Sequence, residues 1–396
     1  MSTQNPVFIP GPTNIPDSLR RAIDVPTVDH RSQSFVALFK PVFGKLKRVL
    51  KTETGEVLVF PATGTGGWEA AITNTLSPGD RILAARNGMF SQRWIEMCRR
   101  HGLIVEVIEA EWGAGAPAGR YKDALAADTG RDIKAVLVTH NETATGVRSD
   151  VAAIRRALDA TRHPALLLVD GVSSIASMDF RMDEWGVDIA VTGSQKGFML
   201  PPGLAILGIS RKALAAMESA QCARCFFDFR DMAKANAGGG YPYTPPVNLI
   251  CGLSAALDML LEEGLENVFA RHFRIAEGIR RAVSAWGLDL CAQSPDLYSD
   301  TVSAVRVPEG FDGTLFVTHA AEKYGVAFGV GLGEVAGKVF RIGHLGSMTD
   351  VMALSGIATA EMVMADLGFP VTLGSGVAAA QQYYRETAGH SAARAA

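Results

Sequence analysis

The sequence is poor in the features that mark several large classes of protein. Five cysteines in 396 residues are too few for a disulfide framework, so we expect a reducing compartment, the cytoplasm. The formal net charge is −3 and long blocks of lysine and arginine are missing, so neither nucleic acid nor an anionic membrane is an expected partner. No apolar run is long enough to cross a bilayer, and the start does not resemble a secretion signal.

Patterns that bind metal ions are also missing. The 8 histidines are scattered, and none belongs to an HExxH motif. Cys222 and Cys225 form one CxxC pair, but a zinc site would need a second pair and a thioredoxin-like motif its own βαβ setting. We therefore expect no metal site, and we interpret the CxxC spacing as incidental.

The sequence does have length, glycine and a regular alternation of apolar runs. Its 396 residues, with 41 glycines for turns, allow two or three domain-sized cores. Short β-rich runs alternate with helical patterns, which favours an α/β fold with a mainly parallel sheet. The expected strands are 56–60, 81–85, 104–108, 134–140, 165–170, 188–193 and 204–209. The expected helices between them include 91–102 and 149–163, the second capped by Ser149 or Asp150.

The pattern changes after about residue 260, where helices and a few apolar runs predict a smaller α+β domain. The helices expected around and within it are 248–263, 265–286, 313–324 and 350–366. We divide the chain into an N-terminal arm (1–20), a large domain (21–262), a small domain (263–380) and a flexible tail (381–396). The arm is too rich in proline for regular structure, and the tail is expected to fray.

An acid and a lysine follow two successive strands of the predicted sheet. Asp170 ends the run ALLLVD, and Lys196 lies in GSQKG, directly after DIAVTG. Taken singly, Asp170 is more simply a helix cap or turn residue, and Lys196 a solvent-facing lysine. At the carboxyl edge of a parallel sheet, where ligands bind, the pair suits pyridoxal 5′-phosphate. The lysine can form a Schiff base with the aldehyde, while the aspartate keeps the pyridine nitrogen protonated.

A glycine-rich turn predicts an anion site in the same domain. In FPATGTGGWEA a strand leads to a helix that we expect to begin near Gly67. Backbone N–H groups at such a helix start, with the hydroxyls of Thr63 and Thr65, can bind a phosphate. The turn is neither a P-loop, since no GK[ST] follows, nor a dinucleotide fingerprint, since Glu69 occupies the place of the last glycine.

Arg341 interrupts the apolar run VFRIG, where an unpaired guanidinium would be costly. Two uses of this side chain remain open. It can form a structural salt bridge, or its planar group can bind the α-carboxylate of a substrate.

Eight motifs together resemble the serine–glyoxylate aminotransferases, which are class V pyridoxal phosphate enzymes of fold type I. They are PGPT, TGTGGWE, NGMFSQRW, HNETATGV, DGVSS, GSQKG, YPYTPP and KVFRIGHLG, in the order of the family and over nearly the whole chain. Within the family, the sequence is most similar to the enzymes that move an amino group from L-aspartate to glyoxylate in the β-hydroxyaspartate cycle. The resemblance implies oxaloacetate and glycine as products and a ping-pong reaction, with serine or alanine as alternative donors.

The resemblance also implies roles for individual residues around the cofactor ring. Lys196 is the expected Schiff-base lysine, and Asp170 the expected partner of the pyridine nitrogen. Phe90 would stack on the ring, although plain core packing would equally explain it, and Val172 would cover a ring face. Thr143 would place its hydroxyl near the phenolic oxygen of the cofactor or near the substrate.

The remaining implied roles concern the phosphate and the substrate carboxylate. The residues expected to bind the phosphate are Thr63, Gly64, Thr65 and Gln195. Tyr241 and Thr244 are expected to complete the phosphate site of another subunit, so the resemblance implies a homodimer. With the resemblance, Arg341 is expected to bind the α-carboxylate of the substrate.

The amino donor is the least defined part of this reading. Aspartate carries a second carboxylate, for which His30 and Arg31 are candidate partners, although placement at the surface explains them as simply. A cysteine desulfurase is a more distant alternative. It would need a histidine where Gln195 stands and a reactive cysteine on a mobile loop, whereas the candidate, Cys291, follows the apolar run GLDL. A nucleotide-binding protein and a non-catalytic scaffold are the alternatives from other classes.

Overall fold

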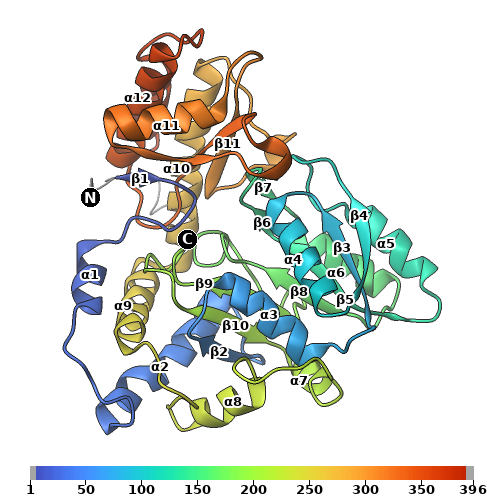
Figure 1. Cartoon of the computed structure of the whole chain (residues 1–396). Coiled ribbons are helices and arrows are strands. Elements are labelled where there is room, and N and C mark those ends of the chain that lie inside the picture. The colour runs from blue at the N-terminus through green and yellow to red at the C-terminus, as the bar shows by residue number, and fades with distance from the viewer. Residues whose placement is uncertain (1–5, 389–396) are drawn as a thin grey trace.

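Seven strands form the central sheet of the large domain in the computed structural model, which describes residues 6–388 (Figure 1). The strands are β2 (Glu56–Phe60), β3 (Arg81–Arg86), β4 (Ile104–Glu109), β5 (Ile133–Thr139), β8 (Leu166–Asp170), β9 (Ile189–Gly193) and β10 (Ala205–Ile209). Their order is β2-β10-β9-β8-β5-β3-β4, and only β10 runs antiparallel to its neighbours. The expected mainly parallel α/β sheet is confirmed.

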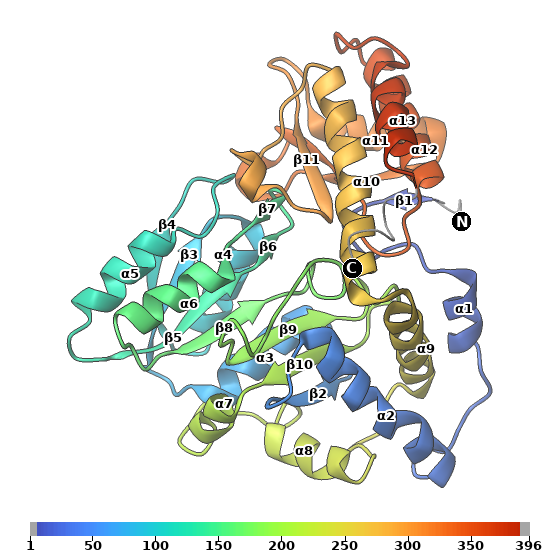
Figure 2. The ribbon, with the colours of Figure 1, turned by 180° about the vertical axis from the view of Figure 1, so that it is seen from behind.

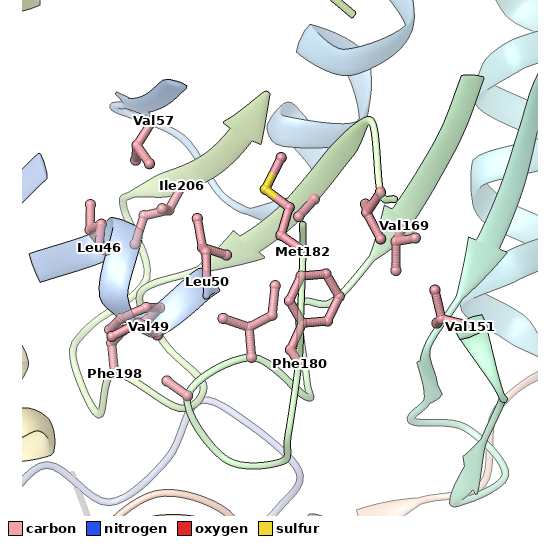
Figure 3. Close-up of a cluster of buried hydrophobic side chains, with 14 of the residues drawn as sticks. Leu46, Val49, Leu50, Val57, Val151, Val169, Phe180, Met182, Phe198 and Ile206 are labelled. Atoms are coloured by element: carbon pink, nitrogen blue, oxygen red, sulfur yellow. The ribbon is translucent and has the colours of Figure 1, made fainter. Parts of the chain in front are cut away.

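Helices cover both faces of this sheet because its strands are apolar on both sides. One face packs against α2 (Gln33–Leu50), α5 (Ala118–Ala127), α6 (Val151–Ala160) and α9 (Val247–Glu263). The other packs against α3 (Gly64–Thr75), α4 (Met89–Arg100), α7 (Arg211–Ala216) and α8 (Phe229–Ala237). Figure 3 shows part of the first core, where Leu46 and Leu50 of α2 lie near Val57 and Ile206 of the strands. Burying each such side chain contributes about 1.5–3 kcal/mol.

A second, four-stranded sheet forms the small domain, which stands above the large one in both views (Figures 1 and 2). Its strands, in the order β1-β12-β13-β11, are β1 (Val7–Phe8), β12 (Ala327–Val330), β13 (Val339–Gly343) and β11 (Val302–Arg306). Its helices are α10 (Leu265–Ala285), α11 (Gly313–Tyr324), α12 (Asp350–Asp366) and α13 (Ser375–Glu386). The chain passes from α9 to α10 through Gly264, whose φ of 83° favours glycine.

Both ends of the described chain are more regular than we expected. In the arm, Val7 and Phe8 pair with β12, and α1 (Asp17–Ile23) forms a helix. The arm takes part in the sheet because Phe8 is buried and stacks on Phe328 at 5.6 Å. In the expected tail, α13 continues to Glu386 because Tyr384 is buried and donates to the carbonyl of Ile275 at 2.9 Å. The rest of the expected tail, 389–396, lies outside the described residues.

Candidate active site

The order of the strands brings Asp170 and Lys196 to the same edge of the sheet. Asp170 is the last residue of β8, and Lys196 lies three residues after the end of β9, the strand beside it. Asp170 is 3% exposed and Lys196 is 9% exposed. The pair expected from the sequence therefore forms a buried acid and a buried amine at the carboxyl edge, where ligands bind in such sheets.

The Asp170 carboxyl is held from one side by the chain itself. Its Oδ1 accepts a hydrogen bond from the backbone N–H of Val172 at 2.9 Å. Burial raises the pKa of Asp170 to about 7, although the Val172 N–H and the charge of Lys196 act in the opposite direction. A cationic group placed against this carboxyl would lower its pKa and keep it ionised at neutral pH.

The Lys196 amine points toward the N-terminal arm. Its Nζ donates a hydrogen bond to the carbonyl of Pro10. Burial lowers the pKa of Lys196 to about 8, and the positive charge of Arg341 acts in the same direction. The arm approaches so closely that a Cβ on Gly11 would collide with the lysine side chain. The lowered pKa leaves a larger share of this amine neutral at pH 7 than in an ordinary lysine, as a nucleophile or general base requires.

The glycine-rich turn forms the N-terminus of α3, which begins at Gly64 rather than near Gly67. Thr63 is the N-cap residue, but its side chain makes no capping bond within residues 6–388, so the start of the helix is available to bind an anion. Gln195 lies beside this turn, because a Cβ on Gly193 would be 2.8 Å from its Oε1 and 3.4 Å from the nitrogen of Gly64. That Oε1 is buried and has no partner in residues 6–388.

The cofactor-facing residues of the prediction fall around this edge. Val172 packs so closely over Gly64 that a Cβ there would collide with its side chain. Phe90, the second residue of α4, is half-buried, and the guanidinium of Arg93 lies 5.5 Å from its ring centroid. Thr143 is buried, and its Oγ1 shares a 2.7 Å hydrogen bond with the hydroxyl of Ser173. Thr63 and Thr65 are exposed in the single chain.

Arg341 reaches the large domain from the small one. Its Nε donates to the carbonyl of Val330 at 2.8 Å and its Nη1 to the carbonyl of Thr143 at 3.0 Å. It forms no ion pair within residues 6–388, so the salt bridge left open by the sequence is not found there. Burial lowers the pKa of Arg341 to about 10, while the charge of Glu142 acts in the opposite direction. Because both of its partners are neutral carbonyl groups, the guanidinium can still bind an anionic carboxylate.

Two pairs of residues are not tied to this cluster in the single chain. Tyr241 stacks on Phe39 at 4.8 Å, and its buried hydroxyl has no partner among the described residues, while Thr244 is exposed. His30 and Arg31 follow α1, and the side chain of Arg31 is exposed. No hydrogen bond in residues 6–388 joins any of the four to Lys196 or Arg341.

The sequence reasoning missed two contributors to the site. One is the arm, since Thr13 donates from its backbone to the carbonyl of Gln195 at 3.3 Å, beside the Pro10 contact. The motif PGPT marks this segment in the sequence, but its local pattern does not predict which surface it contacts. The other is Glu142, a fully buried carboxylate directly before Thr143. The signal for it was an acid following the apolar strand AVLVT, inside a motif already singled out.

A cavity of about 910 Å³ lies elsewhere, between α6 and α10, and Asp170 and Lys196 are not among its lining residues. Two of the charged residues of its wall are paired within the chain, Asp179 with Lys51 and Arg274 with Asp350, and among the described residues its lining includes no lysine. It therefore offers no comparable reactive group. Within residues 6–388 no helix is long and apolar enough to cross a membrane, and no cluster of three potential metal ligands occurs.

Comparison with known proteins identifies the family. The family model described as "Aminotransferase class-V" matches residues 22–336. The chain is 68% identical over 396 residues, and 100% of both chains, to L-aspartate–glyoxylate aminotransferase of Paracoccus denitrificans (strain Pd 1222). It is 55% identical over 388 residues to serine–glyoxylate aminotransferase of Hyphomicrobium methylovorum, covering 98% of this chain and 96% of the relative.

The structural comparison agrees with the sequence comparison. The crystal structure of pyridoxamine–pyruvate aminotransferase from Mesorhizobium loti superposes with a TM-score of 0.91 at 29% identity, covering 98% of each chain. The family and fold type that the motifs resemble are therefore confirmed. The chain belongs to the class V aminotransferases, which are pyridoxal phosphate enzymes of fold type I.

Proposed function

We propose that this protein transfers the amino group of L-aspartate to glyoxylate, giving oxaloacetate and glycine. The observation that carries the proposal is the buried pair of Asp170 and Lys196 at neighbouring strand ends. The donor rests on the 68% identity to a protein named L-aspartate–glyoxylate aminotransferase over the full length of both chains.

The residues present fit pyridoxal phosphate, whose aldehyde binds amines and whose protonated ring accepts electrons. Lys196 would bind the aldehyde covalently, and Asp170 would hold a proton on the ring nitrogen. The N–H groups at the start of α3 support a phosphate site formed by Thr63, Gly64, Thr65 and Gln195, to which the Gln195 side chain would donate through its Nε2. Phe90 and Val172 would line the two faces of the ring.

Lys196 would also move the proton of the reaction. Its free amine would take the α-proton of the substrate and return it to the cofactor carbon that carried the aldehyde, two bonds from the α-carbon. The lowered pKa of about 8 supports this double role of base and acid. The Pro10 carbonyl accepts a hydrogen bond from Nζ and would hold the free amine in place between these steps.

Arg341 would bind the α-carboxylate of both substrates. A guanidinium has five N–H donors, and the bonds to Val330 and Thr143 occupy two, which leaves three. Those on Nη1 and Nη2 form the planar fork that suits a carboxylate. Thr143 and Ser173 supply hydroxyls close to that place.

Serine is the alternative donor, because the chain is also 55% identical to a serine–glyoxylate aminotransferase. Alanine is the third candidate donor. Neither His30 nor Arg31 gains support as the partner of a second carboxylate. A desulfurase is disfavoured, because Cys291 is buried and burial raises the pKa of its thiol.

We further propose a homodimer in the cytoplasm. The unpartnered hydroxyl of Tyr241 and the exposed Thr244 support a role in the phosphate site of a second subunit. The five cysteines are all free, which supports a reducing compartment.

Single-turnover absorbance measurements test the proposed reaction. The cofactor-loaded protein is mixed in parallel with aspartate, serine or alanine, and glyoxylate is then added. We expect aspartate to bleach the visible band fastest and glyoxylate to restore it, with glycine as the product. Faster bleaching by serine would transfer the assignment to the alternative donor, and no bleaching by any of the three would overturn the proposal.

A further inference from the structure

Glu142 is a fully buried carboxylate that accepts backbone N–H groups from the start of α4 and from its own turn. It ends the short strand β6 (Asn141–Glu142), which pairs with β7 (Val147–Arg148). Its Oε2 accepts the N–H groups of Phe90 at 3.1 Å and Ser91 at 3.0 Å. Its Oε1 accepts the N–H of Ala144 at 3.2 Å. Both oxygens are thus occupied by the chain.

These bonds tie the carboxylate to the first turn of α4. Phe90 and Ser91 are the second and third residues of that helix, where N–H groups have no partner within the helix. A carboxylate at this end also interacts favourably with the helix dipole. The approach is so close that a Cβ on Gly88, the N-cap residue, would collide with the side chain.

The same turn of the chain also holds Arg341. The Thr143 carbonyl, directly after Glu142, accepts the bond from Nη1 of this arginine at 3.0 Å. Glu142 forms no ion pair in the part of the chain that the structure describes. Its charge nevertheless favours the charged form of Arg341, which lies near enough for this interaction. The buried acid is therefore bonded directly to Phe90 of the large domain, and the residue that follows it, Thr143, is bonded to Arg341 of the small domain.

We propose that Glu142 is a positioning residue. Its carboxylate would fix the ring of Phe90 relative to the guanidinium of Arg341, and so would fix the cofactor ring relative to the carboxylate of the substrate. Because both of its oxygens accept backbone N–H groups, we assign it a role through Phe90 and Arg341 rather than a direct contact with a reactant. This inference rests on the proposed function for the roles of Phe90 and Arg341.

The test compares two variants that each remove one buried carboxylate from a helix N-terminus. Glu142→Gln has the same shape, but the NH2 group of the glutamine would face backbone N–H groups that need an acceptor. At least one hydrogen bond would therefore be lost. Glu361→Gln is the matched control, since Glu361 is buried and accepts the N–H groups of Gly376 at 2.6 Å and Val377 at 3.3 Å. These are the second and third residues of α13, in the small domain.

Three readouts are measured on the holoenzyme: visible circular dichroism of the bound cofactor, the KM for aspartate and for glyoxylate, and the melting temperature. We expect both variants to melt earlier. Only Glu142→Gln should weaken the dichroism band and raise both KM values, on the order of tenfold. If the two variants behave alike, with lower melting temperatures only, Glu142 is merely structural and the inference is overturned.

Two additions keep the result decisive. If Glu142→Gln does not fold, Gly88→Ala displaces the same carboxylate by contact and should give the same dichroism and KM changes; unchanged values would overturn the inference. Hydrogen exchange of the Phe90 and Ser91 amides in the cofactor-free protein should quicken in Glu142→Gln and not in Glu361→Gln. Because that readout needs no turnover, it decides the alignment of α4 even if wild-type protein fails to transaminate aspartate.

Discussion

The amine of Lys196 donates a hydrogen bond to the carbonyl of Pro10, 186 residues earlier in the chain. Pro10 follows β1, which belongs to the sheet of the small domain, whereas Lys196 follows a strand of the large domain. The arm therefore joins the two domains directly at the lysine. The position of the amine depends on how the small domain sits, as well as on the large sheet.

Gly11→Ala should damage the site by pushing the arm away from Lys196. Gly11 has a φ of 104°, and an added Cβ would meet the lysine side chain. Gly79→Ala is the control, because Gly79 has a φ of 89° with open space around it. Both changes should cost roughly 1–2 kcal/mol of stability from backbone strain. In steady-state kinetics only Gly11→Ala should lose activity, and equal activities of the two variants would exclude a role for the arm.

The Asp170→Asn variant should bind the cofactor yet lose most of its activity. A neutral amide has no negative charge with which to keep the ring nitrogen protonated. We expect a fall in kcat of about 100-fold or more, the usual cost of losing one electrostatic group at a reacting centre. Asp188→Asn is the control, since Asp188 is a buried acid that accepts the N–H of Leu167 at 2.9 Å. A nearly wild-type kcat for Asp170→Asn would contradict the electron-sink role.

The rate at which cofactor-free protein captures pyridoxal phosphate should rise with pH around a midpoint near 8. Only the neutral amine of Lys196 attacks an aldehyde, and its pKa is lowered to about 8. Arg341→Gln should move the midpoint to higher pH, because it removes a positive charge that disfavours the ammonium. Arg274→Gln, which alters an arginine paired with Asp350, should leave it unchanged. Stopped-flow absorbance measures these rates, and a midpoint near 10 in wild type would contradict the lowered pKa.

Two inactive variants should restore each other if the phosphate site is shared between subunits. Lys196→Ala lacks the amine, and a Tyr241→Ala, Thr244→Ala chain lacks the groups offered to its partner. Mixed dimers then contain one complete site, so random exchange of subunits should recover about a quarter of wild-type activity. The assay is kcat after unfolding and refolding of an equal mixture. Failure to recover any activity, with dimers present by light scattering, would rule out shared sites.

Much of the fold could be predicted because its signals are local. Apolar runs and helical spacing placed the strands of the large sheet within a residue or two, and the ends of two strands located Asp170 and Lys196. Errors occurred where distant contacts override local pattern. The proline-rich arm forms β1 because Phe8 packs on Phe328, and α13 continues into the expected tail because Tyr384 is buried.

The sequence by itself determined the family, the sheet and the chemical types of the reactive groups, since residue identity and periodicity report chemistry and burial. Only the tertiary structure decided the partners of those groups: Pro10 for Lys196, the Thr143 carbonyl rather than an acid for Arg341, and the first turn of α4 for Glu142. The physical reason is distance along the chain. A hydrogen bond between residues tens or hundreds of positions apart leaves no periodic trace in the sequence, and it exists only after both domains have packed.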